Sequence, residues 1–228
     1  MADKIQKAYK ATENIYDNVM TQGSFFSKLY IKVFWSGTDD NEIARRVLSF
    51  IPEAFDGKLL DVPVGTAVFT DKTWRKLNKA EIVCLDYSAD MLAQAKARLD
   101  GCRHISFIQG DVGALTFDDE TFDIVFSMNG FHAFPDKEKA FSETIRVLKR
   151  GVAFIGCFYI RGKSKITDLL ANNILSKKGW FTPPFQTEEE LRQRFGKAFG
   201  SVELYTDGSI VYFKCVKQER KYERHNTY

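Results

Sequence analysis

The sequence of 228 residues lacks the features that mark exported, disulfide-bonded or membrane-spanning proteins. Its four cysteines form no Cys-x-x-Cys pair and have no spacing typical of zinc ligands. No apolar run approaches the roughly 20 residues that a membrane helix needs. The first residues also lack the apolar core of a signal peptide. We therefore expect buried reduced thiols, no metal site, no membrane span and a cytoplasmic location.

Net charge is also scarce, because Lys and Arg number 33 against 30 for Asp and Glu, which gives +3. The whole excess lies within residues 214–228, so residues 1–213 are neutral overall. A neutral body argues against a dedicated nucleic-acid-binding protein, which usually presents a basic face. We expect the charged run Lys214–Arg224 to be a solvated end of the chain.

Apolar residues are plentiful, at 44% of the chain with 20 phenylalanines, so a sizeable core can be buried. From residue 57 onward, short apolar β-type runs alternate with helical patterns, which is typical of a parallel sheet covered on both faces. The expected strands are 57–62, 80–86, 105–108, 122–127, 152–158, 202–205 and 210–216, the last of them antiparallel. The expected helices are 66–78, 88–99, about 136 to near Gly151, and 187–199, the last opened by a capping box.

We expect one domain over residues 1–228, made of a cofactor-binding core with additions at its ends. The core covers residues 57–160, and a helical cap rich in aromatic residues precedes it at 1–50. A lid insertion follows at 161–185, then the C-terminal helix and strands at 187–217 and a tail at 218–228.

Three aspartates end successive expected strands at equal spacing. Asp61, Asp86 and Asp111 are each 25 residues apart, which is the length of one strand–helix unit. The carboxyl ends of parallel strands meet at one edge of a sheet, where open α/β folds bind their ligands. We therefore expect the three carboxylates to surface together.

The first loop, Asp61-Val62-Pro63-Val64-Gly65-Thr66-Ala67, sits where a dinucleotide-binding loop would sit. Pro63 and Ala67 replace the first and third glycines of that pattern, and Pro63 has no N–H to offer a pyrophosphate. Asp61 would repel phosphate but suits an ammonium or sulfonium group. The loop therefore favours S-adenosylmethionine over a nicotinamide cofactor.

This interpretation assigns a contact to each strand end. Asp86 is placed to accept two ribose hydroxyls, with Tyr87 and Met91 beside the adenine, and Asp111 is placed to accept from the adenine amino group. The remaining expected cofactor contacts are Pro63, Gly65 and Thr66 in the first loop, Val112, and Met128 and Asn129 after the fourth strand.

Several segments also match a known family in order and spacing. They are Leu60–Thr66, Leu85–Ser88 with Met91-Leu92, Gly110–Val112, Phe117–Asp123 and Arg146–Gly151. Together they resemble class I S-adenosylmethionine-dependent methyltransferases, in particular the small-molecule group similar to UbiE-like ubiquinone/menaquinone enzymes. The resemblance spans about residues 57–160, and more weakly 187–217. It implies a Rossmann-like, doubly wound, seven-stranded sheet with a final antiparallel strand.

Catalytic and acceptor residues are less defined than the cofactor contacts. His132 follows the fourth strand, where it could act as a general base or could be a hydrogen-bonded loop residue without a catalytic role. Tyr16, Trp35, Phe131 and Trp180 are the candidate acceptor contacts, and for Tyr16 and Trp35 plain packing is the alternative.

The expected function is methyl transfer from S-adenosylmethionine to a small apolar or aromatic acceptor, without nucleic acid. One alternative is a protein that binds S-adenosylmethionine without catalysis. The other is a nicotinamide-dependent oxidoreductase, against which Pro63 and Ala67 count.

Overall fold

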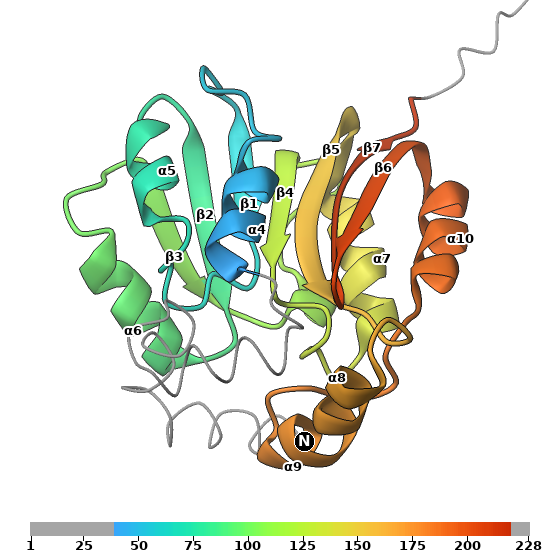
Figure 1. Cartoon of the computed structure of the whole chain (residues 1–228). Coiled ribbons are helices and arrows are strands. Elements are labelled where there is room, and N and C mark those ends of the chain that lie inside the picture. The colour runs from blue at the N-terminus through green and yellow to red at the C-terminus, as the bar shows by residue number, and fades with distance from the viewer. Residues whose placement is uncertain (1–38, 220–228) are drawn as a thin grey trace, which may run out of the picture.

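The computed structural model describes residues 39–219, which form a seven-stranded sheet with helices on both faces (Figure 1). The strand order is β3-β2-β1-β4-β5-β7-β6. The strands are β1 (Lys58–Asp61), β2 (Glu81–Asp86), β3 (Ile105–Gln109), β4 (Phe122–Met128), β5 (Leu148–Tyr159), β6 (Phe199–Asp207) and β7 (Ile210–Lys217). The helices are α4 (Asp40–Leu48), α5 (Asp71–Lys76), α6 (Ala89–Arg98), α7 (Lys137–Val147), α8 (Lys165–Leu170), α9 (Ser176–Lys178) and α10 (Glu188–Ala198), with a 3₁₀ turn η1 (Val112–Ala114) and a π-helical turn η2 (Ala171–Leu175).

Strands β1 to β5 pair in parallel, whereas β7 pairs antiparallel with both β5 and β6. This confirms the predicted Rossmann-like sheet with its antiparallel final strand. The strand order reverses between β1 and β4, so the helices that follow these two strands, α5 and α7, pack on opposite faces of the sheet.

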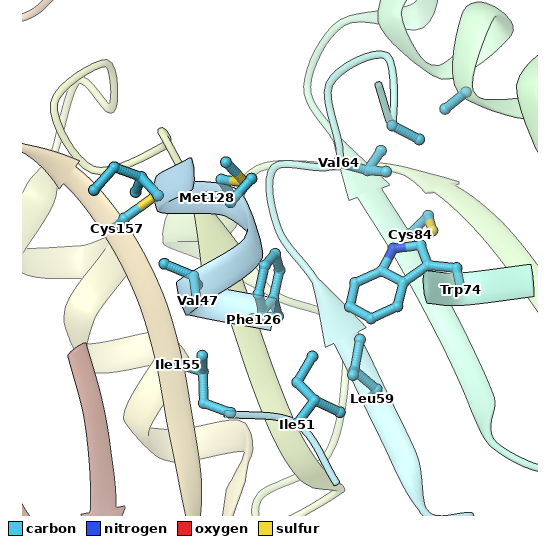
Figure 2. Close-up of a cluster of buried hydrophobic side chains, with 14 of the residues drawn as sticks. Val47, Ile51, Leu59, Val64, Trp74, Cys84, Phe126, Met128, Ile155 and Cys157 are labelled. Carbon is cyan, nitrogen blue, oxygen red and sulfur yellow. The ribbon is translucent and has the colours of Figure 1, made fainter. Parts of the chain in front are cut away.

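Two apolar layers hold the helices against the sheet. On one face, α4, α5 and α6 cover a cluster that includes Trp74 and Phe126, and Figure 2 shows Val47 and Ile51 lying over the sheet beside Phe126. On the other face, α7 and α10 cover a cluster rich in phenylalanine. Between Asp39 and Glu219, no helix is long and apolar enough to cross a bilayer.

The predicted helix caps are present. Ser88 Oγ accepts a hydrogen bond from the Met91 amide at 3.3 Å, and Thr187 and Glu190 form both bonds of the capping box. These short polar side chains fix where α6 and α10 begin.

Two helix boundaries differ from the prediction. The helix expected over 66–78 is only α5, because Gly65 (φ 55°) and Ala67 (φ 58°) adopt left-handed conformations that no right-handed helix contains. The helix expected to stop near Gly151 ends at Val147, because Leu148 already pairs with Phe122 at the start of β5.

The predicted solvated end also begins later than expected, since β7 continues to Lys217. The Lys217 side chain is buried, and its Nζ donates to the carbonyl oxygens of Ile145 and Leu148 at 2.7 and 2.6 Å. Burial lowers the pKa of this ammonium. Lys217 therefore satisfies carbonyls at the end of α7, where a helix leaves them without intrahelical partners.

We predict that Lys217→Met lowers the free energy of unfolding by about 1.5–3 kcal/mol, because it leaves both carbonyls without a charged donor. Lys214→Met, on the same strand but without such bonds, should change it by no more than about 0.5 kcal/mol. Chemical denaturation measures both, and equal effects of the two variants would contradict the role given to Lys217.

Candidate functional site

A cavity of about 160 Å³ opens at the carboxyl ends of the strands, around the point where the strand order reverses. Residues from the ends of β1, β2 and β4 line it, together with residues of the loops that follow β1, β2, β3 and β4. All eleven residues predicted to contact a cofactor border this one cavity: Asp61, Pro63, Gly65, Thr66, Asp86, Tyr87, Met91, Asp111, Val112, Met128 and Asn129.

The Asp86 carboxylate joins two loops at the floor of this cavity. Its Oδ2 accepts from the Gly65 amide at 2.8 Å, and its Oδ1 accepts from the Ser88 amide at 2.9 Å. Burial raises the pKa of Asp86 to about 6, and the backbone bonds from Ser88 and Gly65 oppose the rise. Each oxygen still has a free lone pair, so the carboxylate can accept further bonds from a ligand.

Asp61 is the more deeply buried of the two carboxyls. Its Oδ2 accepts a hydrogen bond from Trp74 Nε1 at 2.8 Å, which fixes its orientation under α5. Burial raises the pKa of Asp61 to about 8, the Trp74 bond lowers it, and the nearby Asp86 charge raises it. A ligand that brings a positive charge would favour the ionised form of this carboxyl.

The first loop is shaped by its glycine. Gly65 adopts φ 55°, and a Cβ placed there would meet no atom within 4 Å, so the space beside its backbone is open. A Cβ at Gly130 would lie only 2.3 Å from Pro63 Cδ, which means that the loops after β1 and β4 touch there. Close backbone approach to a ligand is therefore available at Gly65.

Asp111 and Tyr87 lie at the more exposed end of the cavity. Asp111 Oδ1 accepts from the Gly113 amide at 2.8 Å and so caps η1. Tyr87 is 43% exposed, whereas Met91 and Val112 are buried. The cavity thus combines apolar side chains with the buried carboxyls of Asp61 and Asp86, and Asp111 lies at its exposed end.

The sequence reasoning missed several lining residues because it misplaced two turns. Val68, Phe69 and Thr70 were expected within a helix over 66–78 and so were not predicted to line a site. They belong to the loop before α5 and line the cavity. Ala133, Phe134 and Pro135 also line it. The amides of Ala133 and Phe134 both donate to the Gly130 carbonyl, so this loop makes a tight turn.

That turn separates Phe131 and His132 from the cavity, which neither of them lines. His132 Nδ1 accepts the Tyr159 amide at 3.2 Å, and its ring lies 4.0 Å from the ring of Phe181. Burial and the nearby Lys137 charge lower the pKa of His132 to about 3. Of the two interpretations of His132, these contacts favour a hydrogen-bonded loop residue over a general base.

Of the four candidate acceptor contacts, the two within the described residues, Phe131 and Trp180, do not line the cavity. Phe131 is buried and stacks on Phe141 with ring centroids 4.1 Å apart. Trp180, within the expected lid segment, packs on the core, and its ring centroid lies 5.0 Å from Lys178 Nζ. Tyr16 and Trp35 lie outside the described residues. Within residues 39–219, no group of three or more His, Cys, Asp or Glu side chains is arranged to hold a metal ion.

The segment 161–185 contacts the loop that lines the cavity. The Thr182 amide donates to the His132 carbonyl at 2.9 Å, and Thr182 Oγ1 donates to the Ala133 carbonyl at 2.8 Å. Lys137 Nζ donates to the carbonyls of both Phe134 and Thr182, and burial lowers the pKa of this ammonium to about 8. These bonds couple the expected lid to one wall of the cavity.

Comparisons with known proteins agree with this geometry. A model of the methyltransferase domain matches residues 59–151. Demethylmenaquinone methyltransferase of Thermotoga maritima is 36% identical over 135 residues, which is 59% of this chain and 53% of that protein. The methyltransferase UbiE of Idiomarina loihiensis is 30% identical over 130 residues, 54% of this chain and 52% of that protein. The chain therefore spans about half the length of these curated relatives.

Solved structures share the fold at lower identity. A S-adenosylmethionine-dependent methyltransferase of Thermotoga maritima superposes with a TM-score of 0.67 at 19% identity, covering 94% of this chain and all of that one. Another from Aquifex aeolicus gives a TM-score of 0.55 at 16% identity, covering 82% and 93%. Sheet order, family match and relatives agree: residues 59–151 match a methyltransferase domain, and the chain is similar to the class I S-adenosylmethionine-dependent methyltransferases, with distant similarity to the UbiE and demethylmenaquinone enzymes.

Proposed function

We propose that this chain transfers the methyl group of S-adenosylmethionine, the cofactor of its family, to a small apolar or aromatic acceptor. The observation that carries the proposal is the single cavity bordered by Asp61, Asp86 and Asp111 at the ends of three neighbouring strands. The curated relatives, named as methyltransferases of demethylmenaquinone and of ubiquinone/menaquinone biosynthesis, support a small acceptor.

The lining residues fit the chemical groups of this cofactor. Asp86 has lone pairs for the ribose hydroxyls, and Asp111 at the exposed end can accept from the adenine amino group. Tyr87 and Met91 supply apolar surface for the ring. Asp61 offers a carboxyl to a cationic group, and the open space at Gly65 admits a ligand close to the backbone.

S-adenosylmethionine, when bound, supplies a methyl group already activated by its positively charged sulfur. The chain's own task is then to bind, to align the acceptor and to exclude water. The apolar side chains of Met128 and Phe134 line the cavity and would keep water from its inner part. We assign His132 to holding the Tyr159 backbone rather than to proton transfer.

Two other functions compete with this proposal. A protein that binds S-adenosylmethionine without catalysis would use the same cavity, and it is distinguished by the absence of any methylated product. A nicotinamide-dependent oxidoreductase is disfavoured, because the buried carboxyl of Asp61 would face a pyrophosphate and Pro63 offers it no amide.

The direct test of activity incubates the full chain and S-adenosylmethionine labelled in its methyl group with a fractionated small-molecule extract. We expect label to enter an organic-soluble compound. Label that stays on the cofactor, while the cofactor binds, would favour the non-catalytic alternative.

We predict that Asp86→Ala weakens binding of S-adenosylhomocysteine by about 1–3 kcal/mol, which is about 5-fold to 150-fold, because a buried charged acceptor is lost. Asp90→Ala is the matched control, since Asp90 lies in the first turn of α6 but does not line the cavity. Isothermal titration calorimetry compares the two, and equal affinities would remove Asp86 from the site.

We also predict that S-adenosylmethionine binds more tightly as the pH rises from about 6 to about 8, the pKa values of Asp86 and Asp61 in the free protein. Protonated carboxyls do not attract a cation, so binding below this pH range must first release protons from them. The free-energy cost of this deprotonation vanishes above the range. Asp61→Asn should flatten the upper part of the profile. A wild-type affinity that is constant or falls over this range would contradict the assignment of Asp61.

A further inference from the structure

The segment after β5 exposes apolar side chains that a folded chain ordinarily buries. Ile166 and Leu169 of α8 are each 63% exposed, and Ile174 of η2 is 46% exposed. The opposite side of the same segment is buried, at Thr167, Ala171 and Leu175. We call Ile166, Leu169 and Ile174 the apolar ridge. Contiguous exposed aliphatic side chains of this kind typically mark a contact surface.

Lysines flank the apolar ridge at both ends. Lys165 begins α8, and Lys177 and Lys178 form the end of α9, all three exposed. Among the described residues, none of the three forms an ion pair, whereas Lys163 pairs with Glu188 on α10. The ridge therefore carries positive charge that nothing described in the fold neutralises.

The one acidic residue of this segment faces the protein. Asp168 Oδ1 accepts from the Tyr159 hydroxyl at 2.7 Å, and its Oδ2 accepts from the Gly162 amide at 2.9 Å. Its negative charge is thus used to anchor α8 to the end of β5. The segment therefore exposes aliphatic side chains to solvent, with lysine ammonium groups at either end.

This combination matches an anionic lipid surface. A helix that lies in the membrane interface buries its apolar side chains at the level of the acyl chains and places lysines at the phosphate groups. We propose that the apolar ridge and Lys165, Lys177 and Lys178 form a surface that docks this chain reversibly on an anionic bilayer.

Two other occupants are less suited to this surface. Residues 1–38 of the same chain carry five lysines against three acidic residues, so their charge has the same sign as that of the ridge. A second copy of the chain would bring the same lysines against these and would repel in the same way. Of these three occupants, only the lipid surface offers negative charge together with an apolar interior that can bury the ridge.

The ridge lies at the edge of the sheet where the cavity opens. The segment follows the carboxyl end of β5, and Figure 1 shows α8 and α9 beyond that end of the sheet. Thr182 and Lys137 tie its last residues to the loop that lines the cavity. Docking would thus turn the cavity edge towards the lipid, and, on the proposed function, would give the site access to an apolar acceptor dissolved there.

The test is sedimentation of the full chain with sucrose-loaded vesicles, without cofactor or acceptor. We expect the chain to pellet with vesicles of phosphatidylcholine containing about 30% phosphatidylserine but not with phosphatidylcholine alone, and to be released by salt. Because no methyl transfer is measured, failure of docking and failure of the proposed function are separate results.

Variants locate the surface. The triple variant I166S/L169S/I174S should lower vesicle affinity by roughly 10-fold or more, and K165Q/K177Q/K178Q by roughly 100-fold, because each lysine contributes about 5-fold. The matched control is Tyr205→Ser, which removes an exposed apolar side chain from β6 and should bind as wild type does. Circular dichroism melts establish that all three variants fold.

Three results would overturn the proposal. The first is a wild-type chain that leaves anionic vesicles unbound. The second is a ridge variant that binds them as well as wild type. The third is a ridge variant that melts at a lower temperature or changes the oligomeric state while wild type shows no vesicle binding, because the ridge would then be covered by protein.

Discussion

The carboxylate of Asp86 is the interaction on which the site depends. It accepts the Gly65 amide with one oxygen and the Ser88 amide with the other, so the turn after β1 and the start of α6 are held by one side chain. The left-handed turn at Gly65 shapes the loop that lines the cavity, and Ser88 in turn begins the helix that brings Met91 to the cavity wall. The positions of the loop and of the helix at the cavity thus share one cause.

Much of this could be predicted from sequence because it is local. Apolar runs of strand length alternate with helical patterns, and equal spacing of Asp61, Asp86 and Asp111 follows from the strand–helix unit itself. The sheet, its antiparallel last strand and the caps at Ser88 and Thr187 could therefore be predicted from the sequence. All eleven expected cofactor residues lie around one cavity for the same reason.

The sequence was least informative where contacts with other parts of the chain determine the local conformation. Ala67 reads as a helix residue, but its left-handed backbone ends that pattern. For His132 the sequence left two roles open, because its surroundings depend on Tyr159 and Phe181, which are remote in sequence. Lys217 reads as part of a charged tail, yet the end of α7 supplies the carbonyls that bury it. Charge and periodicity carry no information on such contacts.

The central claim is that the carboxyl-lined cavity is built for S-adenosylmethionine rather than for a dinucleotide. The most direct measurement is a calorimetric titration of the full chain with S-adenosylhomocysteine and, separately, with NADH. We expect saturable binding of S-adenosylhomocysteine and no heat of binding from NADH. Binding of NADH without binding of S-adenosylhomocysteine would contradict it.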